Sequence, residues 1–285
     1  MHSKPERVIQ AKAPLSHGRA VWRLGWVLIH LVAGLGTIFL KFPRLSQAQK
    51  EMRVQAWSLQ MLVCLGIRLI VKGIPAEQGP VLLVANHISW LDISALHAAR
   101  YCRFVSKSDV KGWPVIGRLA AGVGTLFIER QSRRDTRRIV HHMAASLSAG
   151  DVVAVFPEGT TGDGVHLLPF HGNLLQAAIA ANVPVQPVAL TFVDEYTGQH
   201  SQAPCYVGDD TLLSSVWRTL GTPGIAVQVN FGETQSAQGR DRRAWAADLH
   251  VAIAQLRALW VEDAKTARTD MLNSGLGFDV NDQPA

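Results

Sequence analysis

The sequence predicts an α/β domain with a mixed, largely parallel sheet flanked by helices, preceded by an N-terminal two-helix membrane-associating segment. Three observations lead to this prediction. From residue 81 onward, short apolar runs typical of strands alternate with longer helical patterns. Before residue 72, two long apolar segments lie close together. Several predicted strands are followed directly by polar residues, as in open sheets that bind ligands beyond the carboxyl ends of their strands.

Composition narrows the class of protein. A chain of 285 residues is long enough for one large domain with appended segments. Its 48% hydrophobic and 18% charged residues argue against disorder. The net charge of +6 favours an anionic partner such as a membrane surface or a phosphorylated substrate. The cysteines, Cys64, Cys102 and Cys205, lie far apart without metal-type spacing, which is typical of a reducing compartment and predicts no metal site.

The N-terminal region predicts contact with a membrane. Residues 1–21 are polar and basic, and we expect a poorly ordered tail. Residues 24–40 are almost wholly apolar and about as long as the shortest segment that spans a bilayer core, which takes about 17–25 residues. A signal peptide and a buried core helix are the alternatives. Trp22 and Trp26 lie where interfacial aromatic residues belong, which favours the membrane.

The second apolar segment, residues 56–71, differs from the first. It contains Gln60 and Arg68, so it suits a membrane interface or the face of a domain better than the bilayer centre. We therefore predict that residues 22–71 form a helical hairpin that dips into one leaflet or lies on it. The hairpin would return the α/β domain to the side of the membrane where the chain began.

The α/β domain is predicted at residues 72–265, followed by a loose tail at 266–285. We expect its strands at residues 81–85, 102–106, 125–129, 152–156, 185–192 and 225–231. We expect its helices at residues 90–99, 115–122, 133–149, 172–182 and 240–265.

A histidine follows the first strand of this domain. His87 lies in the predicted turn between strand and helix, where Ser89 is a candidate N-cap. Asp92 lies close enough to accept a hydrogen bond from one imidazole nitrogen, which leaves the other free to act as a general base. Taken alone, a histidine in a loop is more often without a function, and the strand–turn–helix context is what makes His87 a candidate.

Three further stretches end predicted strands. Arg130 follows one strand, and its guanidinium could hold a phosphate through two donors. In Glu158-Gly159-Thr160, the carboxylate can accept from a hydroxyl, the glycine allows close approach of the backbone, and the threonine can donate. The two prolines of residues 183–188 indicate a stiff wall or an edge strand. Each stretch alone is also compatible with an ordinary surface residue, turn or edge strand.

Together and in this order, these stretches resemble the glycerolipid acyltransferase family, whose best-known members are the 1-acylglycerol-3-phosphate acyltransferases. The family pattern contains Asn-His-x4-Asp, Gly-x-x-Phe-Ile-x-Arg, Phe-Pro-Glu-Gly-Thr and a proline-bearing apolar block. Here they correspond to residues 86–92, 124–130, 156–160 and 183–188. The resemblance covers about residues 75–195 and implies an α/β acyltransferase domain, often preceded by a two-helix segment at the membrane.

The resemblance also implies a function. It implies a membrane-associated enzyme, on the cytoplasmic side of an inner membrane, that moves an acyl group from a thioester of acyl carrier protein or coenzyme A to a lysophospholipid hydroxyl. His87 and Asp92 would be catalytic, and the acceptor would be bound by Arg130, Glu158, Gly159 and Thr160. The first expected acceptor is 1-acylglycerol-3-phosphate, giving phosphatidic acid, with no metal or redox cofactor.

Two positions depart from the family pattern. Thr161 stands where an arginine is frequent, and His171 stands where a lysine is expected. Both changes remove a cation near the presumed head-group site. The acceptor could therefore be another lysolipid, such as lyso-ornithine lipid.

The chemistry leaves several alternatives. Ser89 could act as a nucleophile, but it lacks a Gly-x-Ser-x-Gly elbow, so direct attack by the acceptor is preferred. Backbone N–H groups near Gly159, or at the start of the helix after Ser89, could stabilise the oxyanion. A lipid or thioester hydrolase could use the same His–Asp pair, and a non-catalytic membrane-binding protein would tolerate the loss of His87.

A basic cluster lies downstream of the second motif, and its members are Arg130, Arg133, Arg134, Arg137 and Arg138. It could be a solvated helix face or could attract anionic lipid head groups. Nucleic-acid binding is disfavoured, because no aromatic residues are interleaved with these charges.

Overall fold

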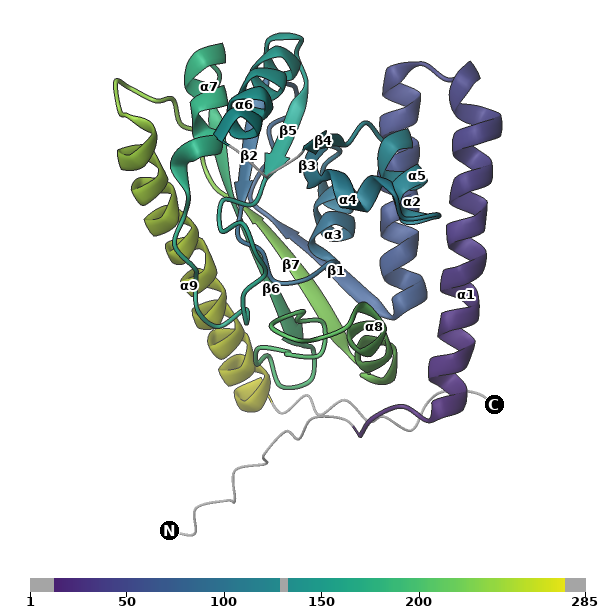
Figure 1. Cartoon of the computed structure of the whole chain (residues 1–285). Coiled ribbons are helices and arrows are strands. Elements are labelled where there is room, and N and C mark those ends of the chain that lie inside the picture. Colours follow the sequence, from purple (N-terminus) through teal and green to yellow (C-terminus); the bar gives the residue numbers. More distant parts are fainter. Residues whose placement is uncertain (1–12, 129–132, 275–285) are drawn as a thin grey trace, which may run out of the picture.

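The computed structural model describes residues 13–128 and 133–274. A seven-stranded sheet in the order β1-β7-β6-β2-β5-β3-β4 forms the centre of the molecule (Figure 1). The strands are β1 Ile67–Lys72, β2 Val81–Ala85, β3 Arg103–Lys107, β4 Leu126–Ile128, β5 Val152–Val155, β6 Val185–Asp194 and β7 Ile225–Phe231. Strands β2 to β6 run parallel, β7 is antiparallel to β6, and β1 is parallel to β7. The predicted mixed, largely parallel sheet is therefore confirmed.

Helices cover both faces of the sheet. Helices α2 (Gln47–Leu65) and α3 (Asp92–Ala99) pack on one face, while α6 (Arg133–Ser148), α7 (Gln176–Ala181) and α9 (Arg242–Ser274) pack on the other. The remaining helices are α1 His17–Gly36, α4 Ser108–Lys111, α5 Ile116–Gly122 and α8 Leu212–Gly221, with short helical pieces η1 Thr37–Lys41, η2 Phe42–Arg44 and η3 Gly172–Leu175.

Strand β2 shows why the sheet needs this cover. All five of its residues are buried. Val81, Leu83 and Ala85 face the core under α2 and α3, whereas Leu82 and Val84 face the core under α6 and α9. A strand buried on both faces is an unbroken apolar run rather than an alternating one. This run places the polar residues that follow it at the carboxyl edge of the sheet.

The hairpin that precedes the sheet consists of α1 and α2, which lie side by side in Figure 1. The rings of His30 and Trp57 stack with centroids 4.8 Å apart. A His30 ring nitrogen lies 2.8 Å from the Trp57 carbonyl oxygen, and the Trp57 indole donates to the His30 carbonyl oxygen over 3.2 Å. Gly34 makes this contact feasible, because a Cβ there would lie 2.6 Å from the Trp57 indole nitrogen.

One helical stretch among the described residues, His17–Arg44, is long and apolar enough to cross a membrane by length and composition. Its most apolar window has a mean hydropathy of 1.7 and is 11% buried, so this stretch is not a core helix. The large exposed apolar side chains along it are Val21, Trp22, Trp26, Leu28, Ile29, Val32, Phe39 and Leu40. Helix α2 does not share this composition, so the prediction of two membrane-associating helices was overstated.

Several predicted boundaries were wrong. The helix expected through Val71 ends at Leu65, because Gly66 adopts a left-handed conformation with φ of 74°. Residues Ile67–Lys72 then form the edge strand β1, which pairs with β7. Helix α1 begins inside the predicted basic tail, and α9 runs to Ser274, inside the predicted loose tail. Helices α4 and α8 were not predicted.

The proline-bearing stretch also differs from its prediction. Residues 183–188 lead into β6, which lies between β7 and β2 and is not an edge strand. Pro187 is tolerated there because the β7 ladder begins only at Val188, where Phe231 is its partner. The missing N–H of Pro187 therefore falls beyond the end of that ladder, and its carbonyl accepts from Gly232 N over 2.9 Å.

Candidate active site

The turn after β2 is fixed to the neighbouring strand by Asn86. Its side-chain amide donates to the Leu190 carbonyl over 3.0 Å, and its side-chain oxygen accepts from Leu190 N over 2.7 Å. Because Leu190 belongs to β6, this buried pair of hydrogen bonds holds the end of β2 in place. The sequence had marked Asn86 only as part of a motif, and its pairing with a strand 104 residues away had no local signal.

One carboxylate oxygen of Asp92 is the hydrogen-bond partner of three nitrogen atoms in this turn. Its Oδ2 lies 2.7 Å from His87 Nδ1 and accepts from the backbone N–H groups of Ile88 and Ser89 over 2.6 and 2.9 Å. The Asp92 side chain is 0% exposed. It is also the first residue of α3, where the helix dipole favours a negative charge. The predicted His87–Asp92 hydrogen bond is thus confirmed.

This contact determines which imidazole nitrogen is available for chemistry. With Nδ1 directed at the carboxylate, the neutral His87 ring would donate there, and Nε2 would then be its acceptor nitrogen. The ring stacks on Phe156, with centroids 4.1 Å apart and planes 8° from parallel. The His87 side chain is 20% exposed. A ring held on one edge and one face, and still partly exposed, can take a proton from a bound hydroxyl.

Glu158 lies directly beneath this turn. Its two carboxylate oxygens accept from the backbone N–H groups of His87 and Leu168 over 2.9 and 3.2 Å. Burial raises the pKa of Glu158 to about 7, although both backbone donors act in the opposite direction. The structure therefore places Glu158 beside His87, in contact with the backbone of the turn. Its role as an acceptor for a head-group hydroxyl stays a prediction.

The turn after Glu158 is exposed at Gly159 and Thr160. Gly159 has φ of 74°, a left-handed conformation that favours glycine. Its N–H donates to the Phe156 carbonyl within the turn, so this one of the N–H groups near Gly159 is already engaged and does not serve as a free oxyanion donor. The Gly162 N–H donates to the His87 carbonyl over 2.8 Å, which ties the two loops together. Arg130 lies outside the described residues.

Ser89 is engaged elsewhere. Its side chain is fully buried, and its hydroxyl donates to the Pro204 carbonyl over 2.5 Å and accepts from Leu91 N over 3.2 Å. The predicted N-cap role was wrong, because α3 begins at Asp92 with Leu91 at the cap position. The backbone N–H of Ser89 is also taken, since it donates to Asp92. This geometry disfavours Ser89 as a nucleophile, because its hydroxyl is directed at Pro204 rather than at His87.

The segment that contains this site matches a known protein family. The family model "Acyltransferase" matches residues 68–191. A 1-acyl-sn-glycerol-3-phosphate acyltransferase of Neisseria meningitidis serogroup B is 39% identical over 210 residues, covering 73% of this chain and 80% of the relative. The chain belongs to the glycerolipid acyltransferase family. This acyltransferase is also 41% identical over 186 residues to a lyso-ornithine lipid O-acyltransferase of Pseudomonas aeruginosa, covering 65% of this chain and 70% of that relative.

Its fold has a counterpart among solved structures. The 1-acyl-sn-glycerophosphate acyltransferase PlsC from Thermotoga maritima superimposes with a TM-score of 0.60 at 20% sequence identity, covering 85% of this acyltransferase and 97% of that chain. The likeness extends well beyond residues 68–191, so the fold shared with that protein takes in more than the segment that the family model matches.

Proposed function

We propose that this acyltransferase moves a fatty acyl group from an acyl thioester to the free hydroxyl of 1-acylglycerol-3-phosphate, giving phosphatidic acid. The observation that carries the proposal is the His87–Asp92 pair at the carboxyl edge of the sheet, 2.7 Å apart with the imidazole partly exposed. Transfer to an alcohol needs a base for a weakly acidic hydroxyl, and this pair provides one. The Neisseria relative named for this reaction supports the choice of acceptor.

In the proposed reaction, His87 Nε2 takes the proton of the acceptor hydroxyl while the hydroxyl oxygen bonds to the thioester carbonyl carbon. The tetrahedral adduct then breaks its C–S bond, and the proton on His87 passes to the leaving thiolate. Asp92 stabilises the imidazolium that forms between these steps. General-base catalysis of this kind contributes about 10²–10⁴-fold. The reaction needs no acyl-enzyme and no metal or redox cofactor.

The acceptor would be held at the same edge of the sheet. Arg130 follows β4, whose carboxyl end points the same way as that of β2, and we expect its guanidinium to hold the phosphate. Glu158, Gly159 and Thr160 would contact the glycerol portion. The thioester donor is an acyl carrier protein or a coenzyme A derivative.

Lyso-ornithine lipid is the second candidate acceptor. A relative named for that reaction is 41% identical. Thr161 and His171 also stand where the family pattern has cations, and both lie in the loops that follow β5. A head group that carries its own ammonium needs fewer cations from the protein than a phosphate monoester does.

Membrane association follows from the apolar, largely exposed His17–Arg44 stretch and from the lipid acyltransferase relatives. An exposed apolar face of this size is stabilised by burial in lipid. We propose further that the protein resides at an inner membrane, with its sheet domain on the cytoplasmic side, where both thioester donors would be found.

The test is an assay of the full-length protein with lysophosphatidate, lyso-ornithine lipid and other lysolipids, each with both thioester donors. Wild-type protein should acylate lysophosphatidate, and His87→Ala should not. Release of free fatty acid without an acylated product would identify a hydrolase instead. Equal turnover by wild type and His87→Ala would remove the proposed base from the mechanism, and no turnover with any pair of substrates would overturn the proposed function.

A further inference from the structure

Helix α8 has one packed face and one bare face. Ser215, Thr219 and Leu220 are buried beneath it. On its other side Leu213 is 81% exposed and Trp217 is 41% exposed. Residues four apart in a helix are neighbours on its surface, so these two side chains form one apolar stripe. Leu213 is the more exposed of the two, whereas Trp217 is partly covered.

The helix that carries this stripe packs against the hairpin. Helix α8 packs against the first turns of α1, and Figure 1 shows the two elements next to each other. The Trp217 ring lies 6.2 Å from the His17 ring between centroids. The Arg23 guanidinium donates to the Leu220 carbonyl over 3.2 Å. Val21 and Trp22 are exposed on the same turns of α1, so exposed apolar side chains are present on both of these packed helices.

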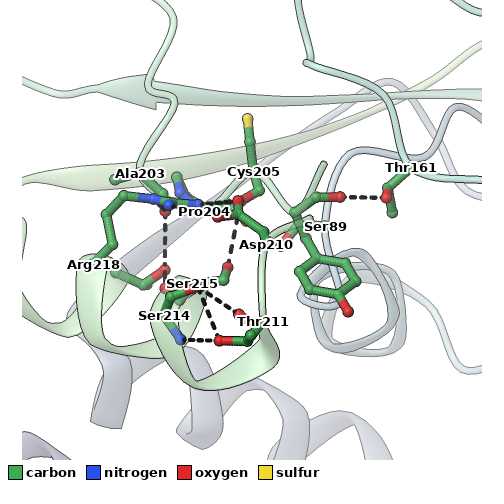
Figure 2. A network of polar contacts seen from close by, with 12 residues as sticks. Ser89, Thr161, Ala203, Pro204, Cys205, Asp210, Thr211, Ser214, Ser215 and Arg218 are labelled. Carbon is green, nitrogen blue, oxygen red and sulfur yellow. Dashed lines mark hydrogen bonds and ion pairs between the residues drawn. The ribbon is translucent and has the colours of Figure 1, made fainter. Parts of the chain in front are cut away.

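A short segment ties α8 to the candidate active site. We call residues 203–206 the strap. Two of its carbonyls face α8, as Figure 2 shows: Arg218 donates to Ala203 O over 2.9 Å and to Cys205 O over 2.6 Å. The Ser215 hydroxyl also donates to Cys205 O over 3.4 Å. Asp210 holds the Arg218 guanidinium through both carboxylate oxygens, which fixes its direction.

The intervening carbonyls of the strap face the other way. The Ser89 hydroxyl donates to Pro204 O over 2.5 Å, and the Thr161 hydroxyl donates to Tyr206 O (Figure 2). The backbone N–H of Tyr206 donates to Ile88 O over 3.2 Å. Carbonyls 203 and 205 thus bind α8, while carbonyl 204 binds the turn that contains His87 and carbonyl 206 binds the loop that follows β5.

A direct contact reinforces this link. The Trp90 indole donates to the Ser215 hydroxyl over 3.2 Å, which joins the turn that contains His87 to α8 without the strap. Helix α8, the strap and the catalytic turn are therefore one connected polar assembly.

We propose that α8 is a second lipid-contacting element, which rests on the membrane surface through Leu213 and Trp217 and, through the strap, sets the depth of the His87 turn relative to the bilayer. The proposal rests on the proposed function, in which the acceptor is a lipid. Amphipathic helices lie in the interface with their apolar side in the acyl boundary, and tryptophan is favoured at that level. Because α8 packs against α1, which carries the exposed apolar side chains of the His17–Arg44 stretch, we infer that the occupant is lipid rather than a protein.

The test compares Leu213→Asp with Val251→Asp in the full-length protein. Val251 is also exposed, at 54%, but it lies on α9 over the opposite face of the sheet. Binding to vesicles of phosphatidylcholine and phosphatidylglycerol and turnover of vesicle-borne lysophosphatidate would be measured. Turnover of a short-chain lysophosphatidate that is monomeric in water would be measured in parallel. Leu213→Met is the conservative variant.

For Leu213→Asp we expect vesicle partitioning and vesicle-borne turnover to fall at least about tenfold, the effect of withdrawing one leucine from lipid. Turnover of the monomeric acceptor should be unchanged, and Val251→Asp and Leu213→Met should behave as wild type. Equal behaviour of the two aspartate variants, or an equal loss on the monomeric acceptor, would overturn the proposal. If wild type acylated no lysolipid, the proposed function would fail, and vesicle partitioning would still decide whether α8 contacts lipid.

Discussion

Replacing Asp92 by asparagine tests the arrangement around His87 most directly. The Oδ2 atom of Asp92 is hydrogen-bonded to His87 and to two backbone N–H groups. The Oδ1 atom of Asp92 has no hydrogen-bond partner among the described residues. An asparagine keeps one acceptor at the Oδ2 position and places an NH₂ group where Oδ1 was. That buried donor would be unsatisfied, at a cost of about 1–3 kcal/mol in the free energy of unfolding. Unfolding should therefore occur about 2–10 °C lower.

The effect on catalysis should be larger. A hydrogen bond to a charged group is worth about 1.5–3 kcal/mol, and the amide loses this support for the imidazolium. If the amide nitrogen turned toward His87, the ring would also be held in the wrong tautomer, which costs about 10⁴-fold in serine proteases. We expect kcat for acyl transfer to fall by about 10²–10⁴-fold.

Initial rates on lysophosphatidate and thermal unfolding would be measured on the same preparation. Asp151→Asn is the matched control, because Asp151 also pairs with a cationic group, Arg103, but lies at the amino edge of the sheet. The control should lose stability without losing kcat. If Asp92→Asn kept more than about a tenth of the wild-type kcat, Asp92 would not support a base at His87.

Four further outcomes are expected. His87→Ala should lower turnover by at least about 10²-fold with little change in unfolding temperature, and a fully active variant would contradict this. The pKa of the Glu158 carboxyl is raised from 4.5 to about 7, so the folded protein holds the carboxyl proton more strongly than the unfolded chain does. The free energy of unfolding should therefore fall as the pH rises through that range. In thermal unfolding measured against pH, Glu158→Gln should lack this decline. Burial lowers the pKa of His97 from 6.5 to about 3, so stability falls as pH drops through that range, and His97→Phe should remove the loss. Val32→Asp, on the exposed face of α1, should weaken retention by vesicles in flotation assays without lowering the unfolding temperature, whereas an unchanged retention would exclude that face from the lipid contact.

The sequence predicted best what depends on neighbouring residues. The bounds of β2 and β7 were predicted correctly, because each is a short β-prone apolar run. The contact between His87 and Asp92 spans five residues and follows from the turn that joins β2 to α3. The long-range contacts were not predicted. Glu158 reaches the His87 backbone across 71 residues, and no pattern along the chain marks that pairing.

The missed elements have physical explanations. Strand β1 continues the apolar composition of α2, and only the left-handed Gly66 and the distant strand β7 make it a strand. The sequence did not predict the strap, because its hydrogen bonds are accepted by backbone carbonyls. Every residue has a backbone carbonyl, so side-chain composition does not indicate such contacts. Helix α8 did carry a signal, since Thr211 caps it and apolar residues recur at helical spacing after it.

The pairing of β1 with β7 has a consequence for synthesis of the chain. Ile67 follows directly on the hairpin, but its partner Ile225 leaves the ribosome about 8–30 s later at ordinary elongation rates. If α1 binds a membrane as proposed, it has time to do so before the sheet can close beside it. Until then β1 remains an unpaired strand beside α2, and closure of so non-local a contact is slow. Under the proposed membrane association, translation order thus favours lipid contact by α1 first and completion of the sheet second.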